Sequence, residues 1–227
     1  MNYPKNMNHG ENVLKSLNEL DNRKNELLNL LREMLSAYGG AIYPVDLFAI
    51  AAVKRAISTA AGFRLLVDSW NMICARTILR TQIDTALRFY SIFIVKKPHD
   101  FVLRVLRGQQ INQIRDKDGK KMSDRYLVNK LTPEYPWLSV VYGNLSGYVH
   151  FSEHHLFNSV EEANDKSRTI TWAIKEIDTK FPEISWIEIA ECFNASTDIF
   201  IKHIKGWIFT KANPDVVAKI KEKLRIK

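Results

Sequence analysis

The chain has 227 residues, of which 46% are hydrophobic and 26% are charged. This is the composition of a globular protein, and it excludes a disordered chain, a collagen and a coiled-coil rod. At about 150 residues per domain the length predicts one domain, with or without appendages. The formal net charge of +8 indicates an anionic partner without proving one.

Two cysteines, Cys74 and Cys192, lie far apart in the sequence. They form neither a disulfide framework nor a zinc-ligand pattern. The N-terminus is polar and rich in Asn, unlike a signal peptide. No stretch approaches the roughly 18 consecutive apolar residues that cross a bilayer. We therefore expect a cytoplasmic protein with reduced thiols and no membrane contact.

Apolar residues recur three and four apart through most of the chain, which is the period of amphipathic α-helices. Gly39-Gly40 is expected to end the first helix, Gly62 to break or kink the second, and Pro98 to end the third, which spans about 50 Å if continuous. The predicted helices, in chain order, cover residues 11–38, 44–60, 63–95, 101–114, 123–131, 133–150, 185–210 and 213–227.

Several of these helices begin at residues that accept hydrogen bonds from backbone amides. Asp100, Ser123 and Thr132 are the predicted N-caps of the three short helices in the middle of the chain. Ser185 and Glu188 have the spacing of a capping box at the start of the last long helix.

The period changes after residue 155. Residues 156–160 and 168–174 flank a polar turn, and the second run contains Thr, Ile and Trp, which favour strands. The predicted fold class is therefore mainly α, a helical bundle with a small β-hairpin inserted at about 156–174. The predicted domain organisation is a flexible leader at 1–10, a single helical-bundle domain at 11–212 and a short basic helix or tail at 213–227.

The third predicted helix carries charge beside its apolar stripe. Arg76, Arg80, Asp84 and Arg88 are four residues apart, so Asp84 can reach either flanking arginine. One interpretation is a solvated row of ion pairs, worth a few tenths of a kcal/mol per pair. The other is a partly buried Arg–Asp pair that faces the bundle and marks a site.

The helix before residue 150 is the second polar feature. Ser139, Gly143 and Gly147 are four apart and form a ridge without bulky side chains, which suits close helix packing. Ser146 and His150 are also four apart and share a face. His150 with Glu153 and His154 would have metal-ligand spacing only on a continuous helix, and Phe151-Ser152 is expected to leave the helix, so no metal is predicted.

Histidine beside arginine instead suits metal-independent chemistry on a phosphodiester. An imidazole that titrates near neutral pH takes a proton from a 2′-hydroxyl, and arginine holds the phosphate and its developing charge. Glycine-rich phosphate loops, Gly-x-Ser-x-Gly, His-Glu-x-x-His and Cys-x-x-Cys are absent from the sequence. This argues against an NTPase, a Rossmann enzyme, a serine hydrolase and a zincin, but not against a helical ribonuclease.

At these residues the sequence resembles an uncharacterised bacterial family of HEPN-like helical domains (higher eukaryotes and prokaryotes nucleotide-binding). The resemblance is carried by residues 75–84, by Tyr142, by residues 145–146 and by residues 149–152, and it runs from about residue 47 to 207. Many HEPN proteins are metal-independent endoribonucleases of toxin–antitoxin, phage-defence and RNA-processing systems. Their signature is an arginine, four to six residues and a histidine, usually completed across a dimer.

The resemblance assigns the signature histidine to His150. Asn144 stands where the family has arginine, with five residues between, and it can hydrogen-bond phosphate without supplying charge. Arg80 or Arg76 from the long helix would then supply the charge, with Asp84 at the usual acidic position. A homodimer is expected from the resemblance, and no cofactor is implied.

Three functions remain open at this point. In the first, a ribonuclease effector, His150 is the general base or acid, Asn144 positions the phosphate, and Arg80, oriented by Asp84, neutralises it. The second is a non-catalytic HEPN-like module that binds nucleotide, RNA or a partner protein such as an antitoxin, with the same polar residues as a buried structural network. The third is a helical adaptor that works through its surface. The residues assigned to phosphate or nucleotide binding are Arg76, Arg80, Tyr142 and Ser146.

The positive charge is unevenly spread. Residues 131–201, which include His150 and the hairpin, have 4 basic and 11 acidic side chains, whereas residues 96–130 have 10 basic and 4 acidic ones. A nucleic acid is therefore expected to follow the basic segments and to meet His150 at a boundary between signs, and its binding should weaken steeply with salt.

Overall fold

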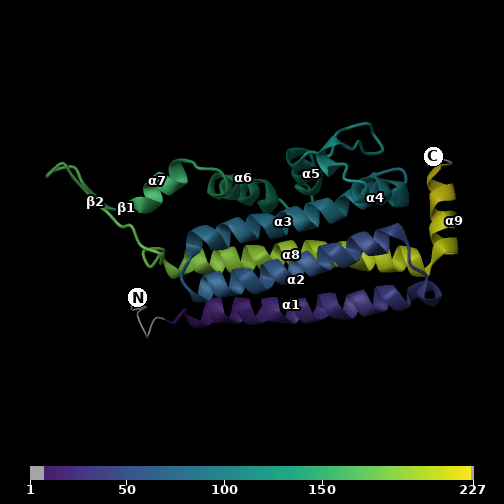
Figure 1. Cartoon of the computed structure of the whole chain (residues 1–227), viewed down its shortest axis with the longest axis horizontal. Helices are drawn as coiled ribbons and strands as arrows, with labels where there is room; N and C mark the ends of the chain where they lie inside the picture. Colours follow the sequence, from purple (N-terminus) through teal and green to yellow (C-terminus); the bar gives the residue numbers. More distant parts are fainter. Residues whose placement is uncertain (1–7, 226–227) are drawn as a thin grey trace.

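The computed structural model describes residues 8–225, with side chains to residue 219. Four long helices lie side by side, α1 (Glu11–Ser36), α2 (Pro44–Asp68), α3 (Met72–Ile94) and α8 (Glu183–Ala212) (Figure 1). Each packs against two of the others, in the cyclic order α1, α2, α3, α8. The prediction of a mainly α fold with one small β-hairpin is confirmed.

A long crossover joins α3 to α8 and carries the short elements. In chain order these are α4 (Pro98–Leu106), α5 (Asp124–Leu131), α6 (Trp137–Val149), α7 (Glu153–Ser159), β1 (Val160–Asn164) and β2 (Thr169–Trp172). Figure 1 shows α4 to α6 along α3, while α7 and the hairpin extend beyond the end of the bundle. Short 3-10 turns cover Ala37–Gly40 and Ile111–Gln113, and α9 (Pro214–Arg225) follows α8.

Aromatic rings fill the space between the four long helices. Phe89 on α3 meets Phe200 on α8 edge to face, with ring centroids 5.2 Å apart, and Phe63 on α2 lies 4.4 Å from Phe193. All four rings are fully buried, and each such ring removes roughly 150–250 Å² of surface from water. The core therefore forms along the whole length of α2, α3 and α8.

Gly62 does not break the second helix, so the predicted boundary there is wrong. Helix α2 continues to Asp68 because Phe63, the next residue, and Val67, one turn after Phe63, are buried in the core. The chain turns instead at Trp70, whose φ of 58° is left-handed, and Asn71 caps α3 by accepting from the Cys74 amide. Packing of the α2 face outweighs the local weakness of one glycine.

The leader predicted at residues 1–10 lies partly outside the described residues, which begin at 8. His9 is buried, with its ring stacked 4.0 Å from that of Trp70 and its Nε2 donating to the Val67 carbonyl at 2.7 Å. These contacts cover the turn between α2 and α3.

The predicted boundaries of the short helices are wrong more often than those of the long helices. Ser123 does cap α5, accepting from the Tyr126 amide, but α4 begins at Pro98 with Lys97 as N-cap, so Asp100 lies inside the first turn. Thr132 ends α5 rather than starting α6, which begins at Trp137. Proline at a first helical position starts a helix as readily as it ends one, and this ambiguity misplaced α4.

The hairpin is shorter than predicted. Residues 156–159 belong to helix α7, and only Val160–Asn164 and Thr169–Trp172 pair as antiparallel strands. The last long helix starts at Glu183 after Pro182, two residues before Ser185, so the capping box is not formed there. No helix in the described part of the chain is long and apolar enough to cross a bilayer.

A buried ion pair closes the bundle at the end where α9 begins. Lys211 on α8 and Asp46 on α2 are fully buried, with Nζ 2.9 Å from Oδ2. Lys211 also donates to the Met34 carbonyl of α1, and Asp46 accepts from Trp207 Nε1 at 2.7 Å and from the Tyr43 amide at 2.8 Å. Because every charge has partners, the pair links α1, α2 and α8 at one point.

Replacing Lys211 by Met leaves the Asp46 carboxylate buried without its cation. The free energy of unfolding should fall by about 3–5 kcal/mol, measured by urea denaturation with circular dichroism. Lys205→Met is the matched control, because Lys205 pairs with Glu26 at the surface of the same helix and should contribute less than about 1 kcal/mol. Equal losses for the two variants would contradict a stabilising buried pair.

Candidate functional site

Arg80 lies in contact with an aromatic ring and a carboxylate from the crossover. Its guanidinium carbon is 3.7 Å from the centre of the Tyr142 ring on α6, and its Nη2 is 3.1 Å from Asp124 Oδ2 at the start of α5. Tyr142 Oη donates to the same Asp124 oxygen at 2.8 Å. This three-residue contact attaches α5 and α6 to α3.

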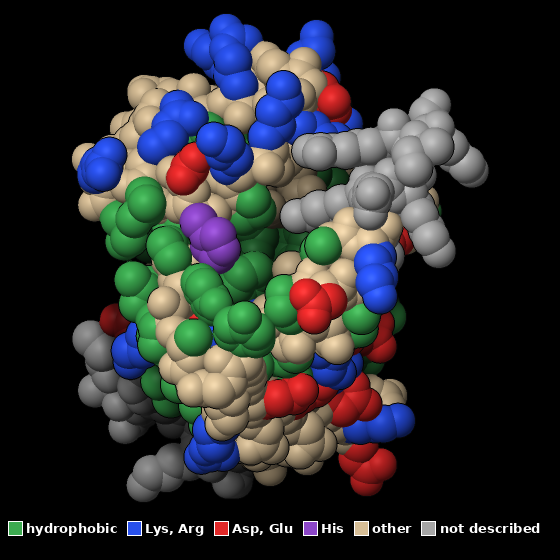
Figure 2. Space-filling model, turned by 90° about the vertical axis from the view of Figure 1, so that its right-hand side faces the viewer, with side chains coloured by type: hydrophobic (Ala, Val, Ile, Leu, Met, Phe, Trp, Pro, Cys, Tyr) green, Lys and Arg blue, Asp and Glu red, His purple; other side chains and the backbone are tan. Residues whose placement is uncertain are grey.

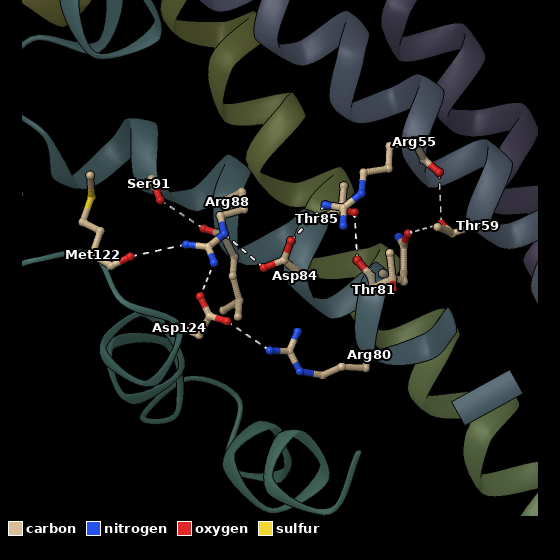
Figure 3. Close-up of polar contacts among 12 residues, drawn as sticks. Arg55, Thr59, Arg80, Thr81, Asp84, Thr85, Arg88, Ser91, Met122 and Asp124 are labelled. Carbon is tan, nitrogen blue, oxygen red and sulfur yellow. Dashed lines mark hydrogen bonds and ion pairs between the residues drawn. The ribbon is translucent and has the colours of Figure 1, made fainter. Parts of the chain in front are cut away.

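The predicted pairing of Asp84 with Arg80 is not formed. Asp84 instead pairs with Arg55 of α2 at 2.9 Å and with Arg88, one turn along α3, at 3.0 Å. Arg88 also pairs with Asp124, so a continuous chain of charges joins α2, α3 and α5 (Figure 3). The prediction failed because Asp124, 44 residues from Arg80 in sequence, competes better than the i+4 neighbour.

The alternating chain explains how these charges tolerate burial. The side chains of Arg80 and Asp84 are only 14% and 19% exposed. Burial lowers the pKa of Arg80, and the charges of Asp84 and Asp124 act in the opposite direction. Since guanidinium groups stay protonated in proteins, Arg80 and Arg88 remain charged and are neutralised by fixed carboxylates.

Arg76 has a different environment. It donates to Tyr148 Oη on α6, and its guanidinium carbon lies 4.6 Å from the centre of that ring and 5.0 Å from the centre of the Phe181 ring. Among the described residues, no carboxylate lies within 4.0 Å of its guanidinium, in contrast to Arg55, Arg80 and Arg88. Half-buried and held by two rings, Arg76 keeps hydrogen-bond donors for a further partner.

Arg76 lines a pocket of about 220 Å³ where α3, α6, α7 and α8 meet. Asn144, His154 and Glu188 are the other strongly polar side chains in its wall. The complete lining is Arg76, Leu79, Val141, Asn144, Leu145, Tyr148, His154, Glu188, Ile189 and Cys192. A guanidinium, an amide and an imidazole thus converge on one small cavity, opposite a single exposed carboxylate.

Helix α7 brings His154 into this pocket. Ser152 caps α7 by accepting from the His154 amide at 3.3 Å, and its hydroxyl donates to the Gly147 carbonyl at 2.8 Å. The His154 ring then stacks on Tyr148, with centroids 5.1 Å apart and an interplanar angle of 1°. The chain leaves helix α6 at His150, as the sequence predicts. It then starts helix α7, of which residues 156–159 were predicted to be a strand.

Gly147 makes this close approach possible. A Cβ atom at this position would lie 2.3 Å from His154 Cδ2, whereas a Cβ at Gly143 would meet nothing within 4 Å. Within the predicted ridge of small residues, Gly147 therefore makes a close contact and Gly143 does not.

His150 and Ser146 lie outside the pocket. His150 is the exposed C-cap of α6, and its ring makes no hydrogen bond within the described part of the chain. The Ser146 hydroxyl donates to the Tyr142 carbonyl at 2.8 Å, within its own helix. Of the residues predicted for catalysis or phosphate binding, the pocket brings together only Arg76 and Asn144.

Asp178, which was not predicted from the sequence, supports the N-terminus of α3 next to Arg76. Its carboxylate accepts from the Met72 amide at 2.9 Å and from the Ile73 amide at 3.4 Å. Burial raises the pKa of Asp178, while the two backbone hydrogen bonds and the charges of Lys180 and Arg76 lower it. Nothing in the sequence indicates that this residue, 106 positions after Met72, caps the helix.

The described residues include no group of three or more His, Cys, Asp or Glu side chains arranged to hold a metal ion. No family model, no curated protein and no solved structure matches the chain.

Replacing Gly147 by Ala should displace His154 from Tyr148. The expected result is a loss of about 1–3 kcal/mol in the free energy of unfolding, together with a changed chemical shift of the His154 ring in NMR. Gly143→Ala, at an exposed helical position with open space around it, should instead stabilise the protein by about 0.5–1 kcal/mol. If both variants behave alike, α7 does not pack on Gly147.

Proposed function

We propose that this protein is a HEPN-like helical module that binds a phosphate group of RNA or of a nucleotide in the Arg76 pocket. The observation that carries the proposal is a half-buried arginine, fixed by two aromatic rings, with no carboxylate in ion-pair distance among the described residues. A guanidinium presents a planar set of donors that matches phosphate geometry. An anion in this pocket would complete the environment of Arg76.

The other polar groups of the pocket suit the rest of a nucleotide. The Asn144 amide and the His154 imidazole donate or accept hydrogen bonds beside the phosphate position. Glu188 on α8 accepts only, so it favours a hydroxyl or amino group of the ligand and disfavours a second phosphate close by. A single phosphate with an attached ribose is the ligand class that these groups support.

The ion-pair chain supports a structural role for Arg80, Asp84 and Tyr142 in this module. Arg80 and Tyr142 both contact Asp124, and Asp84 has two arginine partners. Binding a phosphate at Arg80 would require breaking these contacts. Arg76 has no carboxylate partner within 4.0 Å in the described part of the chain, which makes it the better cation for a ligand.

Metal-independent RNA cleavage is a second candidate function, and one observation favours it. The imidazole of His154 shares the pocket with Arg76, so a base and a phosphate-binding cation are present together. In this version His154 would act in place of the exposed His150. The protein would then be an endoribonuclease of the toxin–antitoxin or phage-defence type that the family resemblance implies.

Binding is tested with Arg76→Gln and a fluorescein-labelled single-stranded RNA, by fluorescence anisotropy at low salt. We expect the dissociation constant to rise about tenfold, because a charge-assisted bidentate contact is lost. Arg32→Gln is the control, since Arg32 is exposed on α1 and bonds only its neighbour Asn29 among the described residues. Equal affinity of the wild type and the Arg76 variant would overturn the proposal.

A cleavage assay separates the two candidate functions. Incubation of end-labelled RNA in EDTA, followed by gel electrophoresis, shows whether the chain cuts RNA without metal. Cleavage that disappears in His154→Ala but persists in His150→Ala would establish the ribonuclease. Binding without cleavage supports the non-catalytic module.

The proposal includes a homodimer formed through the arm, which we define as residues 151–175. Six large apolar side chains on the arm are more than half exposed, and a two-stranded hairpin is not stable in water without cover. These side chains are Phe151, Leu156, Phe157, Ile170, Trp172 and Ile174. The arm has 4 acidic and 3 basic side chains, so its exposed apolar side chains rather than its charge would drive the association of two copies. The proposal places this dimer in the cytoplasm, where Cys74 and Cys192 stay reduced.

The double variant Phe157→Lys, Trp172→Lys should be monomeric, measured by light scattering after size-exclusion chromatography. Two lysines cannot be buried in an apolar interface without losing their hydration. Phe209→Lys, at an equally exposed aromatic position on α8, should leave the mass of the dimer unchanged. If the wild type is monomeric, the arm does not form a homodimer, and its partner is instead a different protein, such as an antitoxin.

A further inference from the structure

A second pocket lies at the opposite end of the bundle, and four of its nine lining residues carry aromatic rings. It has a volume of about 340 Å³ and lies where α2 begins and α8 ends. The lining residues are Tyr38, Tyr43, His99, Trp207, Thr210, Lys211, Pro214, Val217 and Ala218. Figure 2 shows this end of the molecule, where hydrophobic side chains surround a histidine and Lys and Arg side chains gather above them.

The rings of this pocket are held in place by the buried ion pair. Trp207 donates its indole N–H to Asp46, which fixes the ring at the base of the pocket. His99 lies 5.7 Å from Trp207 and 5.5 Å from Tyr43, and Tyr38 lies 6.4 Å from Tyr43, all measured between ring centres. The space is therefore lined by four rings before any ligand arrives.

Two local features distinguish this pocket from ordinary core packing. Tyr38 is 52% exposed and has left-handed backbone angles, φ 55° and ψ 48°, which are unfavourable for a residue with a side chain. Such conformations cluster at ligand sites. In addition, His99 Nδ1 is buried without a hydrogen-bond partner among the described residues, which leaves an unused polar atom in the pocket wall.

Positive charge gathers at the same end of the molecule as the rings (Figure 2). Lys96 and Lys97 precede His99 in sequence, and both line a separate pocket of about 350 Å³. The charged residues of that pocket are Lys96, Lys97, Asp100, Arg104, Arg115 and Asp116. Asp100 Oδ2 lies 3.7 Å from Lys97 Nζ, and the four basic side chains outnumber the two carboxylates, so this pocket attracts anions.

We infer that the aromatic pocket takes the planar base of a nucleotide whose phosphate lies against Lys96 and Lys97. Bases stack on Tyr, Trp and His rings with little dependence on sequence, and lysines hold the phosphate. A methylated ammonium would also suit aromatic rings, but the neighbouring cations repel it. The inference is independent of the proposed function, because no residue of the Arg76 pocket is involved.

The test is a titration with AMP by isothermal calorimetry and saturation-transfer NMR, in the wild type and in the Arg76→Gln variant. The Arg76→Gln variant removes any contribution of the Arg76 pocket to AMP binding. Tyr38→Gly is the decisive variant, since glycine suits the left-handed backbone and the protein should keep or raise its melting temperature. Without the ring, the dissociation constant for AMP should rise at least about tenfold.

Two further variants test which residues contact the phosphate and which contact the base. Lys97→Gln should weaken AMP but not adenosine, because only the phosphate is affected. Phe209→Ala, at an equally exposed aromatic position on α8 that does not line the pocket, should bind AMP as the wild type does. The inference is overturned if AMP at 10 mM does not bind to the Arg76→Gln protein, if Tyr38→Gly binds AMP unchanged, or if tetramethylammonium binds where AMP does not.

Discussion

Helix α3 depends on partners for the charges that it carries into the interior of the protein. Its apolar sides pack against α2 and α8, and its remaining side presents Arg76, Arg80, Asp84 and Arg88. Isolated charges at such half-buried positions would destabilise the fold by several kcal/mol each. Asp124 supplies carboxylate oxygens to two of these arginines. The position of the crossover over α3 follows from this requirement.

The same requirement separates structural from functional arginines. Arg80 and Arg88 are neutralised within the chain, whereas Arg76 receives aromatic rings in place of a carboxylate. Stacking preserves the charge of a guanidinium and keeps its in-plane donors available. Three arginines on one helix thus have different roles, and the difference comes from which part of the crossover covers each one.

Local sequence patterns were enough to predict part of this structure. The heptad-like spacing in α1, the Ser123 cap and the strand-forming residues of β2 are properties of neighbouring residues, and these predictions held. The predicted helix break at Gly62 and the predicted pairing of Arg80 with Asp84 were wrong, because residues distant in sequence determine both. For the site, the sequence indicated Arg76 and Asn144, but the third member, His154, depends on how α7 folds back onto Gly147, which no local spacing encodes.

The order of the helices has a consequence for how the protein is made. Helix α8 packs against both α1 and α3, yet it is synthesised after the whole crossover. At roughly 5–20 residues per second, the ribosome needs on the order of ten seconds between the end of α3 and the end of α8. During this time the apolar faces that receive α8 remain uncovered, so nascent chains should attract chaperones. The high sequence separation of these contacts also predicts slower folding than in a bundle with short loops only.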